Sequence, residues 1–193
     1  MAELHVVVLA AGRATRFGGR KLDTPCAGKP LGRWALDAAE AAGLGPGTIV
    51  TGPGGVAFAG GWTVLVNPEP ETGLGSSLSL AAREALKRGA EALLILLADM
   101  PLVSPEFLRQ LAAAAPPAAT RQPDGRAGVP ALLDRPLLEK AAMLIGDRGA
   151  GPLLSGATLL DPPLGTLRDV DTAEDLAEVE KVLLGSGQPL SRQ

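Results

Sequence analysis

Short apolar runs alternate with helical patterns along almost the whole chain, and this alternation limits the possible folds more than any other feature. With 193 residues, the chain is long enough to bury a substantial core. Apolar runs without polar interruptions are typical of strands that are buried on both faces. The pattern predicts an α/β fold, a Rossmann-like three-layer sandwich with a mostly parallel central sheet.

Six runs have the length and the apolar content of strands, at residues 6–9, 48–51, 63–66, 93–97, 118–120 and 128–133. Between and after them lie helical patterns at residues 30–42, 76–88, 104–115 and 172–184. Ser104 and Thr172 are expected to be N-caps, Ser76 or Ser77 to cap its own helix, and Pro30 to lie near a helix start. We expect one domain over residues 1–185 and a flexible tail over 186–193.

The charge and cysteine content exclude several classes of function. A formal net charge of −3 gives no electrostatic basis for broad binding to nucleic acid or to membranes. The only cysteine, Cys26, cannot form an intrachain disulfide, and a buried thiol is expected. No apolar run approaches the roughly 20 residues that span a bilayer, and the first residues lack the pattern of a signal peptide. These features favour a cytoplasmic protein.

The segment after the first strand combines small residues with positive charge. Ala10, Ala11 and Gly12 allow a ligand to approach the backbone, whose amides can converge on phosphate oxygens. Four cations then occur within nine residues, namely Arg13, Arg16, Arg20 and Lys21. A loop of solvated surface arginines would have the same composition. The segment fits neither the dinucleotide-binding fingerprint nor the Walker A motif, so composition leaves both interpretations open.

Acidic residues lie where a metal ion would accompany phosphates. Asp99 follows the carboxyl end of the 93–97 strand, and ligands of parallel sheets bind at the carboxyl ends of the strands. Mg²⁺ takes one or two carboxylates together with phosphate oxygens and water, which favours Asp99 as a ligand over a simple turn residue. Asp169 and Asp171 point the same way on an extended segment before the last helix, where they could also be capping residues.

Several motifs with matching spacings resemble those of the nucleotidyltransferases related to the molybdenum cofactor enzymes. They are residues 9–12, 16–19, 21–22, Pro25 and 28–31. The resemblance implies a fold of the nucleotide-diphospho-sugar transferase type, with Leu9, Ala10, Ala11 and Gly12 contacting a nucleoside triphosphate. It also implies that Arg16 and Lys21 are catalytic cations that hold phosphates and offset charge in the transition state.

Three further segments extend the resemblance. Residues 73–78, Gly-Leu-Gly-Ser-Ser-Leu, are similar to the cytidylyltransferase branch, which implies that Gly75 and Ser76 lie beside the nucleobase. Asp99 and Asp171 would then be the paired metal carboxylates that hold Mg²⁺, and Asp99 would also lie at the nucleotide. Residues 146–150 resemble an acceptor-side segment, which gives Asp147 and Gly149 as acceptor residues.

The resemblance therefore implies a cytidylyltransferase that joins CMP from CTP to the phosphate of molybdopterin and releases pyrophosphate, with transient contact to a molybdoenzyme. Guanylyl transfer to the same cofactor and transfer to a sugar or alcohol phosphate remain alternatives. A nucleotide- or cofactor-binding chaperone is the alternative outside enzymes. Val129 stands where related sequences often have histidine, and it can neither donate a hydrogen bond nor take a proton, so the acceptor stays open.

Overall fold

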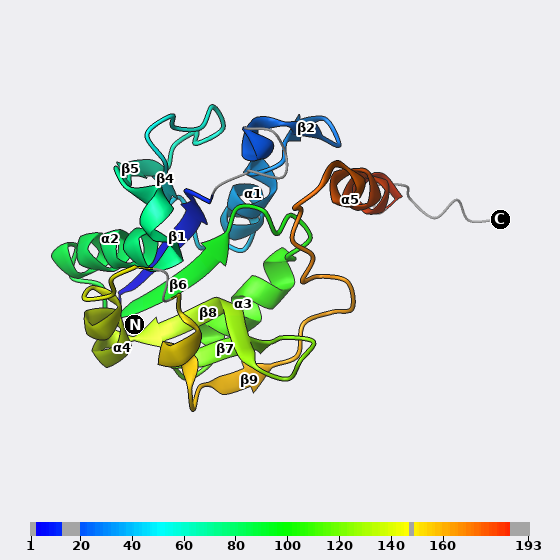
Figure 1. The fold of residues 1–193 in the computed structure, drawn as a ribbon. Helices are drawn as coiled ribbons and strands as arrows, with labels where there is room; N and C mark the ends of the chain where they lie inside the picture. The colour runs from blue at the N-terminus through cyan, green and yellow to red at the C-terminus, as the bar shows by residue number, and fades with distance from the viewer. Residues whose placement is uncertain (1–2, 13–19, 147–148, 186–193) are drawn as a thin grey trace.

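The central sheet of the protein has seven strands in the computed structural model, which describes residues 3–12, 20–146 and 149–185 (Figure 1). In spatial order they are β5 (Thr63–Val66), β4 (Thr48–Thr51), β1 (Leu4–Ala10), β6 (Ala92–Leu97), β8 (Ala127–Asp134), β7 (Ala118–Arg121) and β9 (Thr158–Leu160). The first four are mutually parallel, β8 is antiparallel to both neighbours, and β7 and β9 are parallel. The predicted mostly parallel sheet is confirmed.

Helices cover both faces of this sheet (Figure 1). One face packs against α1 (Arg33–Ala41) and α3 (Pro105–Ala113), the other against α2 (Leu74–Lys87) and α4 (Arg135–Ala141). Successive residues of β1 alternate between the two cores, since Val8 packs on the α1 side and Val7 on the α2 side. The three-layer sandwich is confirmed. None of the helices described is long and apolar enough to cross a membrane.

The start of the first helix differs from the prediction. Pro30 lies in a small antiparallel hairpin of β2 (Pro25–Cys26) and β3 (Lys29–Pro30), and α1 begins only at Arg33. The hairpin turns at Ala27 and Gly28, whose φ angles are 48° and 87°. It closes through the amide of Leu31, which donates to the Thr24 carbonyl at 2.9 Å. The fixed φ of Pro30 fits this strand as well as a helix start, so the proline alone did not identify the first turn of a helix.

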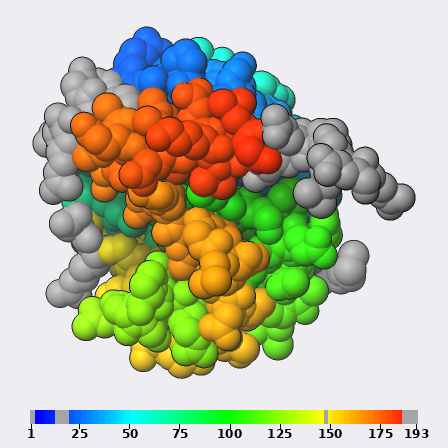
Figure 2. All heavy atoms as spheres, turned by 90° about the vertical axis from the view of Figure 1, so that its right-hand side faces the viewer, coloured from blue at the N-terminus to red at the C-terminus, as the bar shows by residue number. Residues whose placement is uncertain are grey.

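The last helix, α5 (Ala173–Gly185), lies beside this hairpin rather than on the sheet. Figure 2 shows α5 and the segment leading into it next to the N-terminal part of the chain. Cys26 and Leu31 form a small buried cluster with Val170 and Val179 of this C-terminal part, so the thiol is buried as predicted. The hydroxyl of Thr172 accepts from the Asp175 amide at 3.1 Å, which confirms Thr172 as the cap.

Two other helix starts were predicted with different success. Ser104 is the N-cap of α3, because its hydroxyl accepts from the Phe107 amide at 3.2 Å. The prediction that Ser76 or Ser77 caps α2 is wrong. The helix already begins at Leu74, after Gly73 with φ 109°, and both serines lie inside the first turns. Helix α4 was missed, although Asp134 before Arg135-Pro136 is a capping signal and accepts from the Leu137 amide.

Candidate active site

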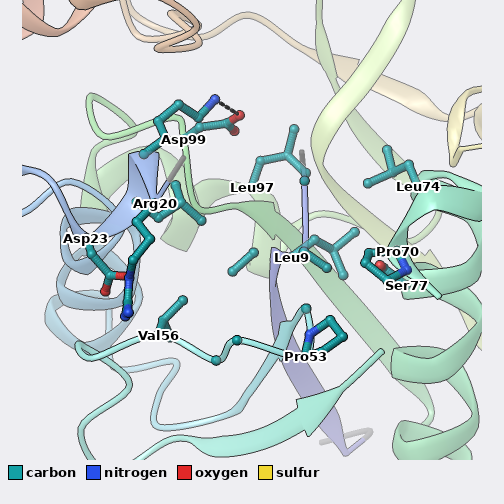
Figure 3. A pocket seen from close by; sticks show the side chains of 18 of the residues that line it. Leu9, Arg20, Asp23, Pro53, Val56, Pro70, Leu74, Ser77, Leu97 and Asp99 are labelled. Carbon is teal, nitrogen blue, oxygen red and sulfur yellow. Dashed lines mark hydrogen bonds and ion pairs between the residues drawn. The ribbon is translucent and has the colours of Figure 1, made fainter. Parts of the chain in front are cut away.

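A cavity of about 590 Å³ opens at the carboxyl ends of the parallel strands (Figure 3). Its position follows from the sheet, because the carboxyl ends of β1, β4 and β6 lie at one edge. Seven residues predicted from the sequence line it, namely Leu9, Ala10, Ala11, Gly12, Lys21, Asp99 and Asp171. Residues from both ends of the chain therefore meet around one cavity.

The end of β1 forms the floor of this cavity. Leu9, Ala10 and Ala11 are at most 8% exposed, so mainly their backbone and small side chains face a ligand. A Cβ added at Gly12 would meet no atom of the described residues within 4 Å, so among these residues the glycine leaves open space rather than relieving a clash. This floor gives a ligand access to the backbone, as the sequence predicted for this segment.

Lys21 forms an ion triad with two carboxylates at the cavity wall. It lies in a short 3-10 helix, η2 (Lys21–Asp23), and its side chain is 9% exposed. The Nζ atom lies 3.0 Å from Oδ2 of Asp99 and 3.3 Å from Oδ1 of Asp171. A buried ammonium needs such partners, because charge removed from water is costly unless it is paired. The two carboxylates are more exposed, at 28% and 56%, and remain accessible from the cavity.

Backbone hydrogen bonds fix the two carboxylates relative to each other. The Ala98 amide donates to the Leu9 carbonyl at 3.0 Å, which continues the pairing of β6 with β1 beyond the strands. The buried Val170 donates its amide to the Asp99 carbonyl, also at 3.0 Å. Asp171 follows Val170 directly, so this bond brings the C-terminal segment to the end of β6.

The neighbourhood of the triad is rich in negative charge. Partial burial and then repulsion from Asp99 and Asp171 raise the pKa of Asp169 to about 6, although much of this residue is exposed, while Lys21 acts in the opposite direction. Asp175, in the first turn of α5, has a lowered pKa because the Thr172 hydroxyl and the Asp171 and Thr172 amides donate to its carboxylate. The site thus favours an additional cation.

The described residues contain no group of three or more His, Cys, Asp or Glu side chains arranged to hold a metal ion. Asp99 and Asp171 nevertheless present two carboxylates at one wall of the cavity. Two carboxylates suffice for Mg²⁺ when substrate phosphates and water supply its other ligands. These two residues could therefore hold a metal that arrives with a phosphate-bearing substrate.

The start of α2 contributes other residues than those predicted. Gly75 and Ser76 are not among the lining residues, whereas Gly73, Leu74 and Ser77 of the same segment are. The Ser76 hydroxyl donates to the Gly73 carbonyl at 2.8 Å and is engaged within the helix. Contact of Gly75 and Ser76 with a nucleotide stays a prediction.

One wall of the cavity was missed in the sequence. It is the segment Gly52–Val56 after β4, and Figure 3 shows Val56 of this segment beside Arg20 and Asp23. Asp23 joins this wall to η2, because its carboxylate accepts from the Ala57 amide and from Arg20, both at 2.9 Å. The signal was present as Gly-Pro-Gly-Gly directly after a predicted parallel strand, whose carboxyl end had to lie at the same edge as β1.

Three of the residues of interest, Arg13, Arg16 and Asp147, lie outside the described residues. Gly149 is described, and a Cβ added there would approach Leu74 Cδ2 to 3.2 Å. The predicted acceptor segment thus adjoins the start of α2, where Leu74 lines the cavity. Its role with an acceptor stays a prediction.

A search for known families matches the MobA-like NTP transferase domain over residues 6–162. The chain belongs to this family. Purine catabolism protein PucB of Bacillus subtilis is 31% identical over 196 residues, which cover 92% of this chain and 96% of that protein. Bifunctional protein GlmU of Xanthobacter autotrophicus is 42% identical over 118 residues, but these cover only 57% of this chain and 26% of GlmU.

Solved structures support the same assignment. A nucleotidyl transferase from Methanothermobacter, Mth528, superposes with a TM-score of 0.81 at 25% identity, over 96% of this chain and 99% of that one. Rv0371c of Mycobacterium tuberculosis gives 0.79 at 28% identity, over 93% and 98%. A CMP:2-keto-3-deoxy-manno-octonic acid synthetase complexed with CTP gives 0.72 at 16% identity, which shows the fold alone, over 96% and 100%. The chain is a nucleotidyltransferase with the fold that the sequence predicted.

Proposed function

We propose that this nucleotidyltransferase uses CTP and transfers CMP to the phosphate of molybdopterin, releasing pyrophosphate. The observation that carries nucleotidyl transfer is the Lys21 ammonium between Asp99 and Asp171, in the cavity whose floor is residues 9–12. This arrangement brings three features together in one cavity: the Lys21 ammonium for phosphates, the Asp99 and Asp171 carboxylates for a metal, and the accessible backbone of residues 9–12. Molybdopterin and CTP follow from the resemblance of the motifs to the cytidylyltransferase branch.

The reaction needs little covalent chemistry from the protein. A phosphate oxygen of the acceptor attacks the α-phosphorus of CTP, a new P–O bond forms, and the bond to the β-phosphate oxygen breaks. An ionised phosphate is already a nucleophile, so no general base is required. The chain mainly positions the two substrates and offsets their negative charge. Lys21 supplies this positive charge next to the floor of the cavity, and Arg16 is proposed to supply more.

Asp99 and Asp171 would hold Mg²⁺ in this proposal. Both are carboxylates at the cavity wall, and the excess of negative charge around them, partly offset by Lys21, fits a divalent cation. A bound Mg²⁺ would offset charge on the phosphates. A similar protein supports a divalent metal, since Rv0371c has been solved in complex with manganese.

The segment Gly73–Leu78 supports the choice of CTP. Gly73, Leu74 and Ser77 from this segment line the cavity, so its resemblance to the cytidylyltransferase branch concerns residues that can meet the nucleotide. Val129, in place of the histidine frequent in related sequences, makes the acceptor the less constrained half of the proposal.

The proposal is tested by pyrophosphate release from purified protein with Mg²⁺, molybdopterin, and CTP, GTP, ATP or UTP. We expect CTP to give the largest kcat/KM. A larger value with GTP would replace the assignment by guanylyl transfer. Turnover with sugar phosphates but not with molybdopterin would refute the acceptor, and nucleotide binding without any turnover would indicate a chaperone.

A further inference from the structure

Glu180 of α5 makes a polar contact with the hairpin of β2 and β3. Its Oε1 atom accepts a hydrogen bond from the backbone amide of Ala27 at 2.7 Å, across 153 residues of sequence. The residue before it, Val179, is fully buried in a cluster with Cys26 and Leu31. Helix α5 therefore holds the hairpin through one apolar and one polar contact, made by adjacent residues.

The turn that Glu180 contacts has an unfavourable backbone conformation. Ala27 and Gly28 both have a positive φ, as in type I′ hairpin turns, which favour Asn, Asp or Gly at the first position. Among the residues that the structure describes, Ala27 is the one non-glycine residue with a left-handed φ. The turn pairs Cys26 with Lys29, so the Ala27 amide needs an acceptor outside the hairpin. Glu180 supplies this acceptor and stabilises a conformation that alanine disfavours.

Backbone hydrogen bonds tie the hairpin to the short helix η2, which carries Lys21. The Leu31 amide donates to the Thr24 carbonyl and the Gly32 amide to the Leu22 carbonyl, both at 2.9 Å. The Thr24 amide in turn donates to the Lys21 carbonyl at 3.1 Å. The chain that leaves the hairpin thus holds η2 in place, and a shift of the hairpin would move Lys21 with it.

Helix α5 is also joined to the carboxylate side of the ion triad. It begins at Ala173, shortly after Asp171, and Val170 lies in the same buried cluster as Val179. Glu180 itself does not line the cavity. Its contact with the hairpin therefore connects the two sides of the triad from outside the site, where it touches no substrate.

We propose that Glu180 is a positioning residue for nucleotidyl transfer: its bond to the Ala27 amide keeps the hairpin seated on α5, and the hairpin keeps the Lys21 ammonium between Asp99 and Asp171. The inference rests on the proposed role of Lys21 in turnover and deepens that part of the proposed function. It is independent of the acceptor and of the choice of CTP over another triphosphate.

Glu180→Ala and Glu180→Gln separate the hydrogen bond from the charge. Both variants remove the negative charge, but glutamine keeps an oxygen that can accept from the Ala27 amide. We expect Glu180→Ala to lower kcat for pyrophosphate release about tenfold and Glu180→Gln to retain most of the wild-type kcat, with both variants folded by circular dichroism. Full activity of Glu180→Ala, or equal losses in the two variants, would overturn the inference.

The thiol of Cys26 reports on the seating of the hairpin and needs no substrate. Burial raises its pKa and the charge of Glu180 adds to this effect, so both variants should gain some reactivity from the loss of charge alone. A hairpin that opens more often exposes the thiol in addition, and we expect an aromatic disulfide reagent to modify Glu180→Ala about tenfold faster than Glu180→Gln. Equal rates would contradict the inference, even if CTP or molybdopterin proves to be the wrong substrate.

A double variant tests whether Glu180 acts through Lys21. Lys21→Met removes the ammonium, so a displacement of residue 21 then has little further effect, and Glu180→Ala should add almost nothing to the loss in kcat. Additive losses would mean that Glu180 acts elsewhere and would overturn the inference. Full activity of Lys21→Met would refute the proposed role of Lys21 and the inference with it, whereas full activity of Glu180→Ala alone would refute only the positioning role.

Glu178→Ala is the matched control. Glu178 lies in the same helix, is exposed and pairs with Arg168 rather than with the hairpin. Its removal should leave both kcat and the rate of Cys26 modification unchanged. Effects equal to those of Glu180→Ala would reduce the result to the charge or stability of α5 and would contradict the positioning role.

Discussion

The backbone amide of Val170 donates to the carbonyl oxygen of Asp99 at 3.0 Å, and this bond joins the segment before α5 to the end of the central strand β6. Asp99 carries one carboxylate of the site, and Asp171, which directly follows Val170, carries the other. The bond thereby sets the spacing of the Asp99 and Asp171 carboxylates around the Lys21 ammonium. The first three predictions below concern this triad.

Asp99→Asn should lower kcat about 10²- to 10³-fold while leaving the fold intact, because it removes one anionic oxygen but keeps the size and a hydrogen-bond acceptor for Lys21. Pyrophosphate release as a function of Mg²⁺ concentration measures the effect. Asp161→Asn is the control, since Asp161 is 76% exposed and pairs with Arg121 away from the cavity. Full activity of Asp99→Asn would remove this residue from the metal site.

Asp171→Asn should act in the same direction but more weakly. Its carboxylate is twice as exposed as that of Asp99, at 56% against 28%, so water can replace more of its contribution. We expect a higher Mg²⁺ concentration for half-maximal activity and a smaller loss at saturating Mg²⁺. A loss greater than that of Asp99→Asn would reverse the assigned order of the two carboxylates.

Lys21→Met should bind Mg²⁺ more tightly than the wild type in the absence of nucleotide, yet turn over at least about 10²-fold more slowly. Removal of the ammonium leaves the Asp99–Asp171 pair without its cation, and repulsion between the carboxylates then favours a metal. Calorimetric titration with Mg²⁺ measures the first effect and pyrophosphate release the second. Lys140→Met, on the exposed side of α4, is the control. Unchanged Mg²⁺ affinity would show that the ammonium does not compete with the metal.

His5→Gln should flatten the pH dependence of stability. Burial and then the charge of Arg88 lower the pKa of His5 below 6.5, while Glu84 and Glu3 act in the opposite direction. Below pH 6.5 the unfolded chain takes up this proton more readily than the folded one, so the free energy of unfolding falls as the pH decreases toward the lowered pKa. Urea unfolding at pH 7.5 and pH 5.5 measures the difference between the two proteins.

This comparison cancels other titrating groups, because both proteins retain them. Asp169, with its raised pKa, contributes in the opposite direction and equally to both. Glutamine can still bond to the Thr48 hydroxyl, which lies 2.8 Å from His5 Nε2 in the native protein. Equal pH dependence in the two proteins would mean that His5 does not titrate differently on folding.

Cys26 should react slowly with an aromatic disulfide reagent in the folded protein, at least about 100-fold slower than in urea. The side chain is fully buried, and burial together with the charge of Glu180 raises the pKa of its thiol. The absorbance of the released thiolate follows the reaction. Rapid stoichiometric modification under native conditions would show that the α5–hairpin contact opens readily.

Local patterns were sufficient for several strands of the sheet. The predicted bounds of 48–51 and 63–66 agree with β4 and with the edge strand β5, because β-branched residues favour the extended conformation. They were insufficient for the hairpin at Pro25–Pro30, where a proline fits both a helix start and a strand. Strand β9, only three residues long, forms through pairing with β7 and has no strong pattern of its own.

The sequence by itself determined the α/β class and the chemistry available, since hydrophobic period and side-chain type are properties of the chain at each point. Lys21, Asp99 and Asp171 could be named from it as candidates. Only the tertiary structure decided that they meet, across sequence separations of 78 and 150 residues. It also decided that Ser77, held by Asn67, lines the cavity and that Ser76 does not. Which residues touch depends on strand order and helix register, and these are set by the packing of the whole core rather than by any local segment.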